Sequence, residues 1–169
     1  MLLAIVPIPI SIETNALEIV ASDASHVEDR AIRIHGWYSF NFLANWHGFR
    51  GTIEIIGYPE TNSPLVFLPL RLSPAFSERR RFGGVRSELL FYESMQVRSV
   101  PPGTVIEVYD SLPFGVVYTG YLFREFIIAI ANADGSIRLS QSPLIVPNAT
   151  TREEAMAAIL RLIPTLQAE

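Results

Sequence analysis

Apolar and polar residues alternate along Ile32–Phe42, which predicts a strand of an antiparallel sheet that is buried on one face only. Glycine leaves a gap in the apolar row at Gly36, and we interpret that gap as a β-bulge. The apolar row consists of Ile32, Ile34, Tyr38, Phe40 and Phe42. The opposite row consists of Arg33, His35, Trp37, Ser39 and Asn41.

Most of the remaining chain consists of short β-prone runs separated by turn signals. Asp134-Gly135 is a hairpin signal, and Asn45–Gly51 and Asp110–Gly115 are interpreted as connections between strands. We therefore expect a single mainly β domain over 1–169, an antiparallel sandwich or open barrel of about 8–10 strands with one C-terminal α-helix. The predicted strands after the first are Thr52–Tyr58, Leu65–Leu70, Glu88–Val97, Thr104–Tyr109, Val116–Phe123, Glu125–Ala131, Ser136–Ser140 and Pro143–Val146.

The C-terminal segment changes to a helical period and predicts a helix over 150–163. Thr150 and Thr151 precede Glu153 and Glu154 at the spacing of a capping box. Proline clashes with the interior of a helix, so Pro164 ends it. We expect the helix to cover an open end or face of the sheet with the apolar stripe Met156, Ile159, Leu160 and Ile163.

The N-terminal segment, residues 1–15, begins with the apolar run MLLAIVPIPI. Pro7 and Pro9 cannot donate to a strand ladder, so the first interpretation is an edge-strand arm. The second interpretation is the remnant of a membrane anchor, because a complete span takes about 20 residues. The run lacks the basic region and the cleavage site of a signal peptide.

Composition excludes several classes of protein. A hydrophobic fraction of 49% with a charged fraction of 18% excludes a disordered chain. The chain has no cysteine, which excludes a disulfide scaffold, cysteine-bound metals and thiol catalysis. All 13 basic residues are arginine, and the net charge is −4. An acidic protein surface argues against nucleic acid as a partner.

The polar face of the first strand is the first candidate ligand site. An exposed tryptophan beside polar groups suits a sugar platform or the centre of a protein interface. The alternative is that a loop or the C-terminal helix covers this tryptophan. The candidate ligand-binding residues on the face are Arg33, His35, Trp37 and Asn41.

The second candidate is an arginine-rich loop within Ser73–Ser87. Arg79, Arg80 and Arg81 stand beside Gly83-Gly84, and guanidinium groups with accessible backbone amides suit a phosphate, a sulfate or an acidic headgroup. The alternative is an ordinary solvated loop, because the segment has no P-loop spacing.

Catalytic and metal chemistry is not indicated by any motif. His26, His35 and His47 lack the spacing of known metal motifs, and the chain has no Gly-x-Ser-x-Gly elbow. We therefore assign no catalytic residue, no metal ligand and no cofactor. The carboxylates on predicted strands that a glycoside hydrolase could pair are Glu54, Glu88, Glu93 and Glu107.

Several segments resemble uncharacterised proteins of Gram-positive bacteria that carry one N-terminal membrane helix and a small β-rich extracytoplasmic domain. These segments are Gly36–Thr61, Leu90–Tyr92, Gly115–Phe123 and the run VPNATTREEA from Val146. The resemblance implies a membrane tether upstream and an extracytoplasmic or cell-surface location. It supplies no catalytic residue, and this chain departs from the pattern by lacking lysine and a complete membrane helix.

The leading functional hypothesis is a non-catalytic binding or interaction domain at the cell envelope, with a protein or polysaccharide as partner. One alternative is a structural subunit of an assembly, in which the apolar arm Leu2–Ile10 pairs with the sheet edge of a neighbour. A third hypothesis is a hydrolase whose site is assembled by the fold. The sequence leaves the oligomeric state open.

Overall fold

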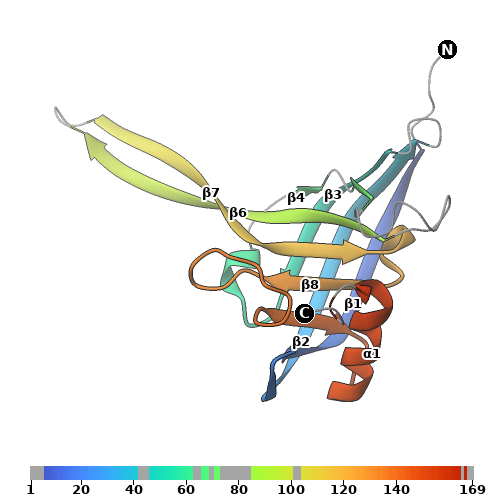
Figure 1. Ribbon diagram of the computed structural model, residues 1–169. Helices are drawn as coiled ribbons and strands as arrows, with labels where there is room; N and C mark the ends of the chain where they lie inside the picture. The colour runs from blue at the N-terminus through green and yellow to red at the C-terminus, as the bar shows by residue number, and fades with distance from the viewer. Residues whose placement is uncertain are drawn as a thin grey trace.

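The structure, a computed structural model, describes residues 6–41, 46–62, 66–68, 71–72, 85–100, 104–164 and 166. Within these residues, nine antiparallel strands form one sheet in the order β4-β3-β2-β1-β9-β8-β7-β6-β5, which curls into an open half-barrel (Figure 1). The expected mainly β fold with a C-terminal helix is thus confirmed in its open-barrel form. The elements are β1 (Val6–Val20), β2 (Asp23–Asn41), β3 (Trp46–Ile55), η1 (Pro59–Asn62), β4 (Val66–Leu68), β5 (Arg71–Leu72), β6 (Arg86–Val100), β7 (Thr104–Thr119), η3 (Tyr121–Phe123), β8 (Phe126–Ile130), β9 (Pro143–Pro147) and α1 (Arg152–Leu162).

The alternation in β2 separates a buried from an exposed face as predicted. Ile32, Ile34 and Tyr38 are completely buried, whereas Arg33, His35 and Trp37 are exposed. The predicted bulge at Gly36 is wrong, because the register with β1 and β3 continues through this residue. Gly36 instead lies opposite Gly51, and the two backbones approach closely beneath the ring of Phe49.

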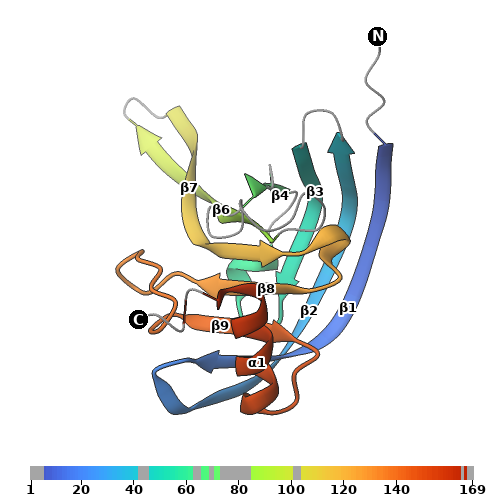
Figure 2. The ribbon, with the colours of Figure 1, turned by 45° about the vertical axis from the view of Figure 1, so that its right-hand side comes forward.

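Two predicted connections are parts of strands. Asn45–Gly51 overlaps β3, which starts at Trp46 and continues to Ile55. Asp110–Gly115 lies within β7, where a register shift opposite Leu90 and Phe91 accommodates Phe114 as an extra residue. Phe114 is buried at this bulge, and the neighbouring Pro113 and Gly115 give the segment the sequence signals of a turn. Figures 1 and 2 show the paired far ends of β6 and β7 extending beyond the rest of the sheet.

The segment after the Asp134-Gly135 turn also differs from the prediction. The turn itself forms, with the Gly135 amide bonded to the Asn132 carbonyl and the Asp134 carboxylate accepting from the Ser136 amide. Ser136–Ser140 then runs as turns and irregular chain and not as a strand. Its backbone bonds are local or reach the β1–β2 turn, so the segment has no neighbouring strand to pair with.

Strand β1 changes its surroundings at Ala16. From Ala16 to Val20 it lies between β2 and β9, so this part is in the middle of the sheet. From Val6 to Asn15, β2 is its one partner strand in the described part of the chain. The prolines of the predicted edge arm, Pro7 and Pro9, lie in this singly paired half, and residues 1–5 are outside the described residues.

The sheet buries apolar side chains on both faces. The concave face encloses residues of β2, β3, β7 and β8 around Ile34, Phe49 and Ile128. The other face, formed by β1, β8 and β9, is covered by α1 (Figure 2). Ala155, Ile159 and Leu162 form the buried helix stripe, so the predicted stripe is rotated: Met156 and Leu160 are only half-buried.

The helix begins at its predicted cap and covers a face of the sheet. Thr151 accepts a bond from the Glu154 amide at 3.3 Å, and the Glu154 carboxylate accepts from the Thr150 amide at 2.9 Å. These two bonds satisfy backbone amides that the first turn leaves unpaired. Helix α1 ends at Leu162, directly before the buried Ile163 and the exposed Pro164.

Candidate functional site

The outer face of β2 brings three of the sequence-predicted residues into one row. Trp37 is 55% exposed and no described element covers it, because α1 packs over β1, β8 and β9. Arg33 forms ion pairs with Glu13 at 2.9 Å and Glu54 at 3.5 Å, and the bond to Glu13 raises its pKa. Its charge is therefore already compensated, which weakens its case as an anion ligand.

The neighbours of Trp37 complete this face. The ring of His35 shares a 3.1 Å hydrogen bond with the Ser11 hydroxyl, and Trp37 is paired in register with Pro9 on β1 and Arg50 on β3. Asn41 lies at the far end of the strand and is half-buried. Arg79, Arg80 and Arg81, the other predicted ligand residues, lie outside the described residues.

A buried polar chain joins β2, β3 and β6 inside the half-barrel. The Nδ1 atom of His47 lies 2.8 Å from the Tyr38 hydroxyl, and its Nε2 atom lies 2.5 Å from Arg86. Arg86 can only donate, so Nε2 accepts and Nδ1 carries the proton. Burial, followed by the nearby Arg86 charge, lowers the pKa of His47 to about 4, and burial raises the pKa of Tyr38 to about 12. His47 is therefore neutral and structural at neutral pH.

The buried histidine predicts a loss of stability in mild acid. Between pH 6.5 and about 4 the unfolded chain binds a proton at His47 that the folded protein excludes, so stability falls as pH falls through this window. We expect a loss of about 3 kcal/mol, measured by denaturant unfolding at pH 7.5 and 4.5. His47→Gln, which keeps an acceptor for Arg86, should lose less over the same interval. Exposed His35→Gln should behave like wild type, and equal losses in all three proteins would contradict the assignment.

A second polar cluster surrounds the buried carboxylate of Glu18. His26 Nε2 and Arg30 Nε each lie 2.8 Å from it, and the Tyr58 hydroxyl donates at 3.0 Å. Burial opposes the charge on Arg30, but its bonds to Glu18 raise its pKa overall. Burial and the Glu18 carboxylate raise the pKa of Tyr58.

The same cluster has a geometry that could hold a metal ion. Ligand atoms of Glu18, His26 and Glu28 lie within 4.8 Å of one another. Arg30 bonds to both carboxylates, at 2.8 Å and 2.5 Å, and occupies the position from which a cation would neutralise them. The arrangement therefore fits a structural ion-pair network better than a metal centre. His26 and Glu28 are two residues apart in the sequence, but Glu18 comes from the neighbouring strand, so no local spacing connects it to them.

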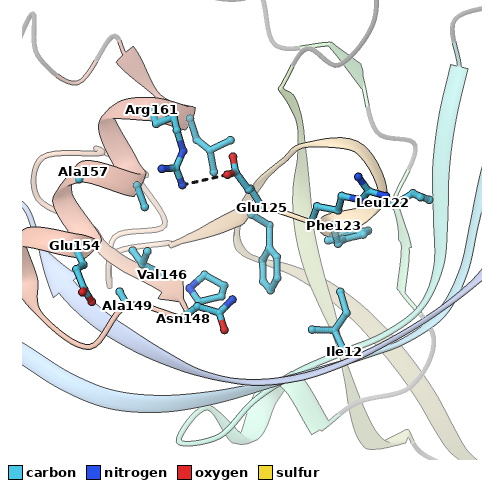
Figure 3. Close-up of a pocket in the computed structure, with 15 residues that line it drawn as sticks. Ile12, Leu122, Phe123, Glu125, Val146, Asn148, Ala149, Glu154, Ala157 and Arg161 are labelled. Atoms are coloured by element: carbon cyan, nitrogen blue, oxygen red, sulfur yellow. Dashed lines mark ion pairs between the residues drawn. The ribbon is translucent and has the colours of Figure 1, made fainter.

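A groove of about 790 Å³ lies between α1, the η3 segment and β1 (Figure 3). Its volume lies in the range of about 300–1,000 Å³ that is usual for ligand sites. Small side chains on the helix, Ala157 and Ala158, leave the space open above an apolar floor. The other apolar lining residues are Ile12, Leu122, Phe123, Phe126, Val146, Pro147, Ala149 and Leu162.

Backbone strain is concentrated around this groove. Among the described residues, the non-glycine residues with positive φ are Leu122 (58°), Phe123 (54°) and Asn148 (60°), and all three line it. Each left-handed residue costs about 1–2 kcal/mol, least for asparagine. Such strain persists where the surrounding structure requires it and is found preferentially at functional sites.

Packing of Phe123 holds the strained turn in place. Its side chain is 1% exposed, and its ring meets those of Phe49 and Phe126 edge-on at centroid distances of 5.1 Å and 5.9 Å. The Gly120 amide bonds to the Glu125 carbonyl at 2.8 Å and closes the loop. Contacts of Phe123 with the aromatic core thus hold η3 against the sheet, where it forms one wall of the groove.

Polar groups stand at defined points of the groove. Asn148 follows the end of β9 and lines the space (Figure 3). Its Oδ1 atom accepts a bond from the Thr14 hydroxyl at 2.7 Å. The amide NH2 group of Asn148 is consequently the end that can donate to a ligand. Arg161 and Glu125 form a 3.2 Å ion pair across the rim, and Arg124 is exposed beside them.

Sequence analysis missed this groove. Its lining comes from four separate segments of the chain, and the left-handed residues of the η3 turn, Leu122 and Phe123, are neither glycine nor asparagine, the residues that would signal this conformation. In the part of the chain that the structure describes, no helix has the length and hydropathy to cross a bilayer. Comparison of this chain with protein-family models, with curated proteins and with solved structures finds no match.

Proposed function

We propose that this chain is a non-catalytic binding domain that takes its ligand in the groove between α1, η3 and β1. The observation that carries the proposal is that Leu122, Phe123 and Asn148, the described non-glycine residues in left-handed conformation, all line this one groove. An apolar floor combined with a few placed polar groups, here the side-chain amide of Asn148, is the usual composition of a site that binds and orients a ligand.

The lining favours binding over hydrolysis. Both carboxylates of the lining have structural partners: Glu125 pairs with Arg161, and Glu154 caps α1. The bonds from Thr150 lower the pKa of Glu154, which is the opposite of what a general acid requires. The described lining contains no histidine, serine, threonine or cysteine that could act as nucleophile or base.

The outer face around Trp37 is a second candidate surface. Its support is the 55% exposure of this large aromatic side chain, next to Pro9 and Arg50 in the register of the sheet. Trp and Arg are enriched at the centres of protein interfaces. Assembly through the N-terminal arm is less favoured, because Pro7 and Pro9 lack the N–H groups that a paired edge needs.

Filling the groove tests the proposal. Ala157 is exposed on α1 and lines the groove, so Ala157→Trp should fill it without disturbing the core. In ligand-observed NMR with a fragment library and short oligosaccharides, we expect ligands that bind wild type to bind this variant at least about ten-fold more weakly. Ala24→Trp, at an exposed alanine outside the lining, should bind like wild type.

The Trp37→Ala variant separates the two candidate surfaces. Fragments whose binding depends on Trp37 and is unaffected by Ala157→Trp would move the binding site to the outer face of β2 and contradict the groove proposal.

Location at the cell envelope belongs to the same proposal and rests on the resemblance of Gly36–Thr61 and the other segments named with it. Fractionation of cells that produce the tagged protein tests that location.

A further inference from the structure

The groove lies at a position of the sheet where, among the described residues, no strand continues the line of β9. β9 lies between β1 and β8 but is only five residues long, and it pairs with β1 from Ala16 to Val20. β1 continues for ten more residues, Val6–Asn15, with β2 as its partner in the described part of the chain. Ile12 from β1, Phe123 from η3 and Asn148 after β9 line the space in line with β9.

Along the edge of β1 that faces away from β2, backbone groups point outward at alternate residues. The Asn15 carbonyl accepts from the Asn148 amide at 2.9 Å, so Asn15 faces away from β2. The register partner Ala31 supports this orientation, because its carbonyl accepts from the Ile56 amide on the β3 side and therefore faces away from β1. The register has no shift between Val6 and Ile19, so Ser11 and Glu13 face the same way as Asn15.

The prolines fit this alternation. Pro7 and Pro9 are also odd-numbered, so the N–H groups that they lack would have pointed to the open edge and not into the β2 ladder. Between Pro9 and Glu13 the edge therefore offers the amides of Ser11 and Glu13 and the carbonyls of Pro9, Ser11 and Glu13. Pairs of groups about 7 Å apart match the two-residue repeat of another β-strand.

We propose that the groove takes an extended peptide segment of a partner protein, which adds to the sheet beside Ser11–Glu13 in line with β9. This inference rests on the proposed binding function of the groove. Main-chain hydrogen bonds to β1 hold the peptide, an apolar side chain lies on the floor around Phe123, and the Asn148 NH2 group donates to a peptide carbonyl. An oligosaccharide or an acyl chain does not carry donors and acceptors in this repeat.

The probe is a phage-displayed library of random linear peptides, followed by affinity measurements on a selected synthetic peptide. Ser11→Pro removes one edge amide in the manner of Pro7 and Pro9, and we expect it to weaken binding at least about ten-fold. Ser11→Ala is the matched control, since it removes the hydroxyl bond to His35 but keeps the amide. It should bind within about two-fold of wild type.

Amide hydrogen exchange gives a second readout that needs no variant. In the free protein, Ser11 and Glu13 should exchange much faster than Ile10 and Ile12, whose amides are in the β2 ladder. The bound peptide should slow the exchange of Ser11 and Glu13 at least about ten-fold. Unchanged exchange at both residues in the complex would overturn strand addition.

The outcomes separate this inference from the function on which it rests. Peptide binding that is lost in Ala157→Trp but unchanged in Ser11→Pro would overturn strand addition and leave the groove as a binding site. Failure to select any peptide, while fragments still bind the groove, would have the same meaning. Peptide binding that is indifferent to Ala157→Trp would overturn both.

Discussion

Gly51→Ala is expected to destabilise the fold by about 3 kcal/mol, the upper part of the range for overpacked cores. A Cβ atom at Gly51 would lie 2.1 Å from the His35 carbonyl oxygen and 2.6 Å from the Gly36 Cα atom. Both are backbone atoms of the neighbouring strand, so relief requires β2 and β3 to separate. The fully buried ring of Phe49 lies 2.6 Å from the same Cβ position, so the new methyl group cannot shift toward the core either.

Chemical denaturation of Gly51→Ala and Gly120→Ala measures this effect. Gly120 is the matched control, because its nearest neighbour, the Glu125 carbonyl oxygen, would lie 3.6 Å from a new Cβ, an ordinary contact. Its φ of −76° is also accessible to alanine. We expect Gly120→Ala to cost less than about 1 kcal/mol. Similar costs for the two variants would mean that the β2–β3 register at Gly36 and Gly51 is wrong.

Glu18→Ala should cost about 3 kcal/mol, because removing one partner of a buried network leaves the others unpaired. The carboxylate is 3% exposed and accepts bonds from three side chains, those of His26, Arg30 and Tyr58. Truncation leaves the Arg30 guanidinium, with a side-chain exposure of 20%, with Glu28 as its one remaining ion-pair partner among the described residues.

Glu28→Ala is the control for this second prediction. Glu28 is 49% exposed and bonds to the same arginine, so solvent replaces much of what the mutation removes. We expect a cost below about 1 kcal/mol. If thermal and urea unfolding gave the two glutamate variants equal stabilities, Glu18 would not be the centre of the network.

The predictable part of this fold is the part encoded by local periodicity. Ile32, Ile34 and Tyr38 are buried and Arg33, His35 and Trp37 face out, because a strand alternates its side chains whatever its neighbours are. The Thr151 cap is equally local, since its bond spans three residues. The rotated stripe of α1 is not local: which helix side is buried depends on the sheet beneath it, formed by β1, β8 and β9.

The candidate site could not be predicted because it depends on where strands end. β9 stops at Pro147 while β1 continues, and only the register between the two defines the open position beside Ser11 and Glu13. The left-handed Leu122 is imposed by burial of Phe123 against Phe49, which belongs to a distant strand. Buried Glu18 and His47 are likewise polar residues whose partners come from other elements.

The most direct test of the groove as the binding site is an assigned amide NMR spectrum of the protein with a bound fragment. We expect the largest shifts on Phe123, Asn148 and Ala157, which come from three separate segments around the groove. Trp37 and its neighbours on the outer face of β2 should be unchanged. Largest shifts at His35 and Trp37, with the groove residues unaffected, would contradict the account.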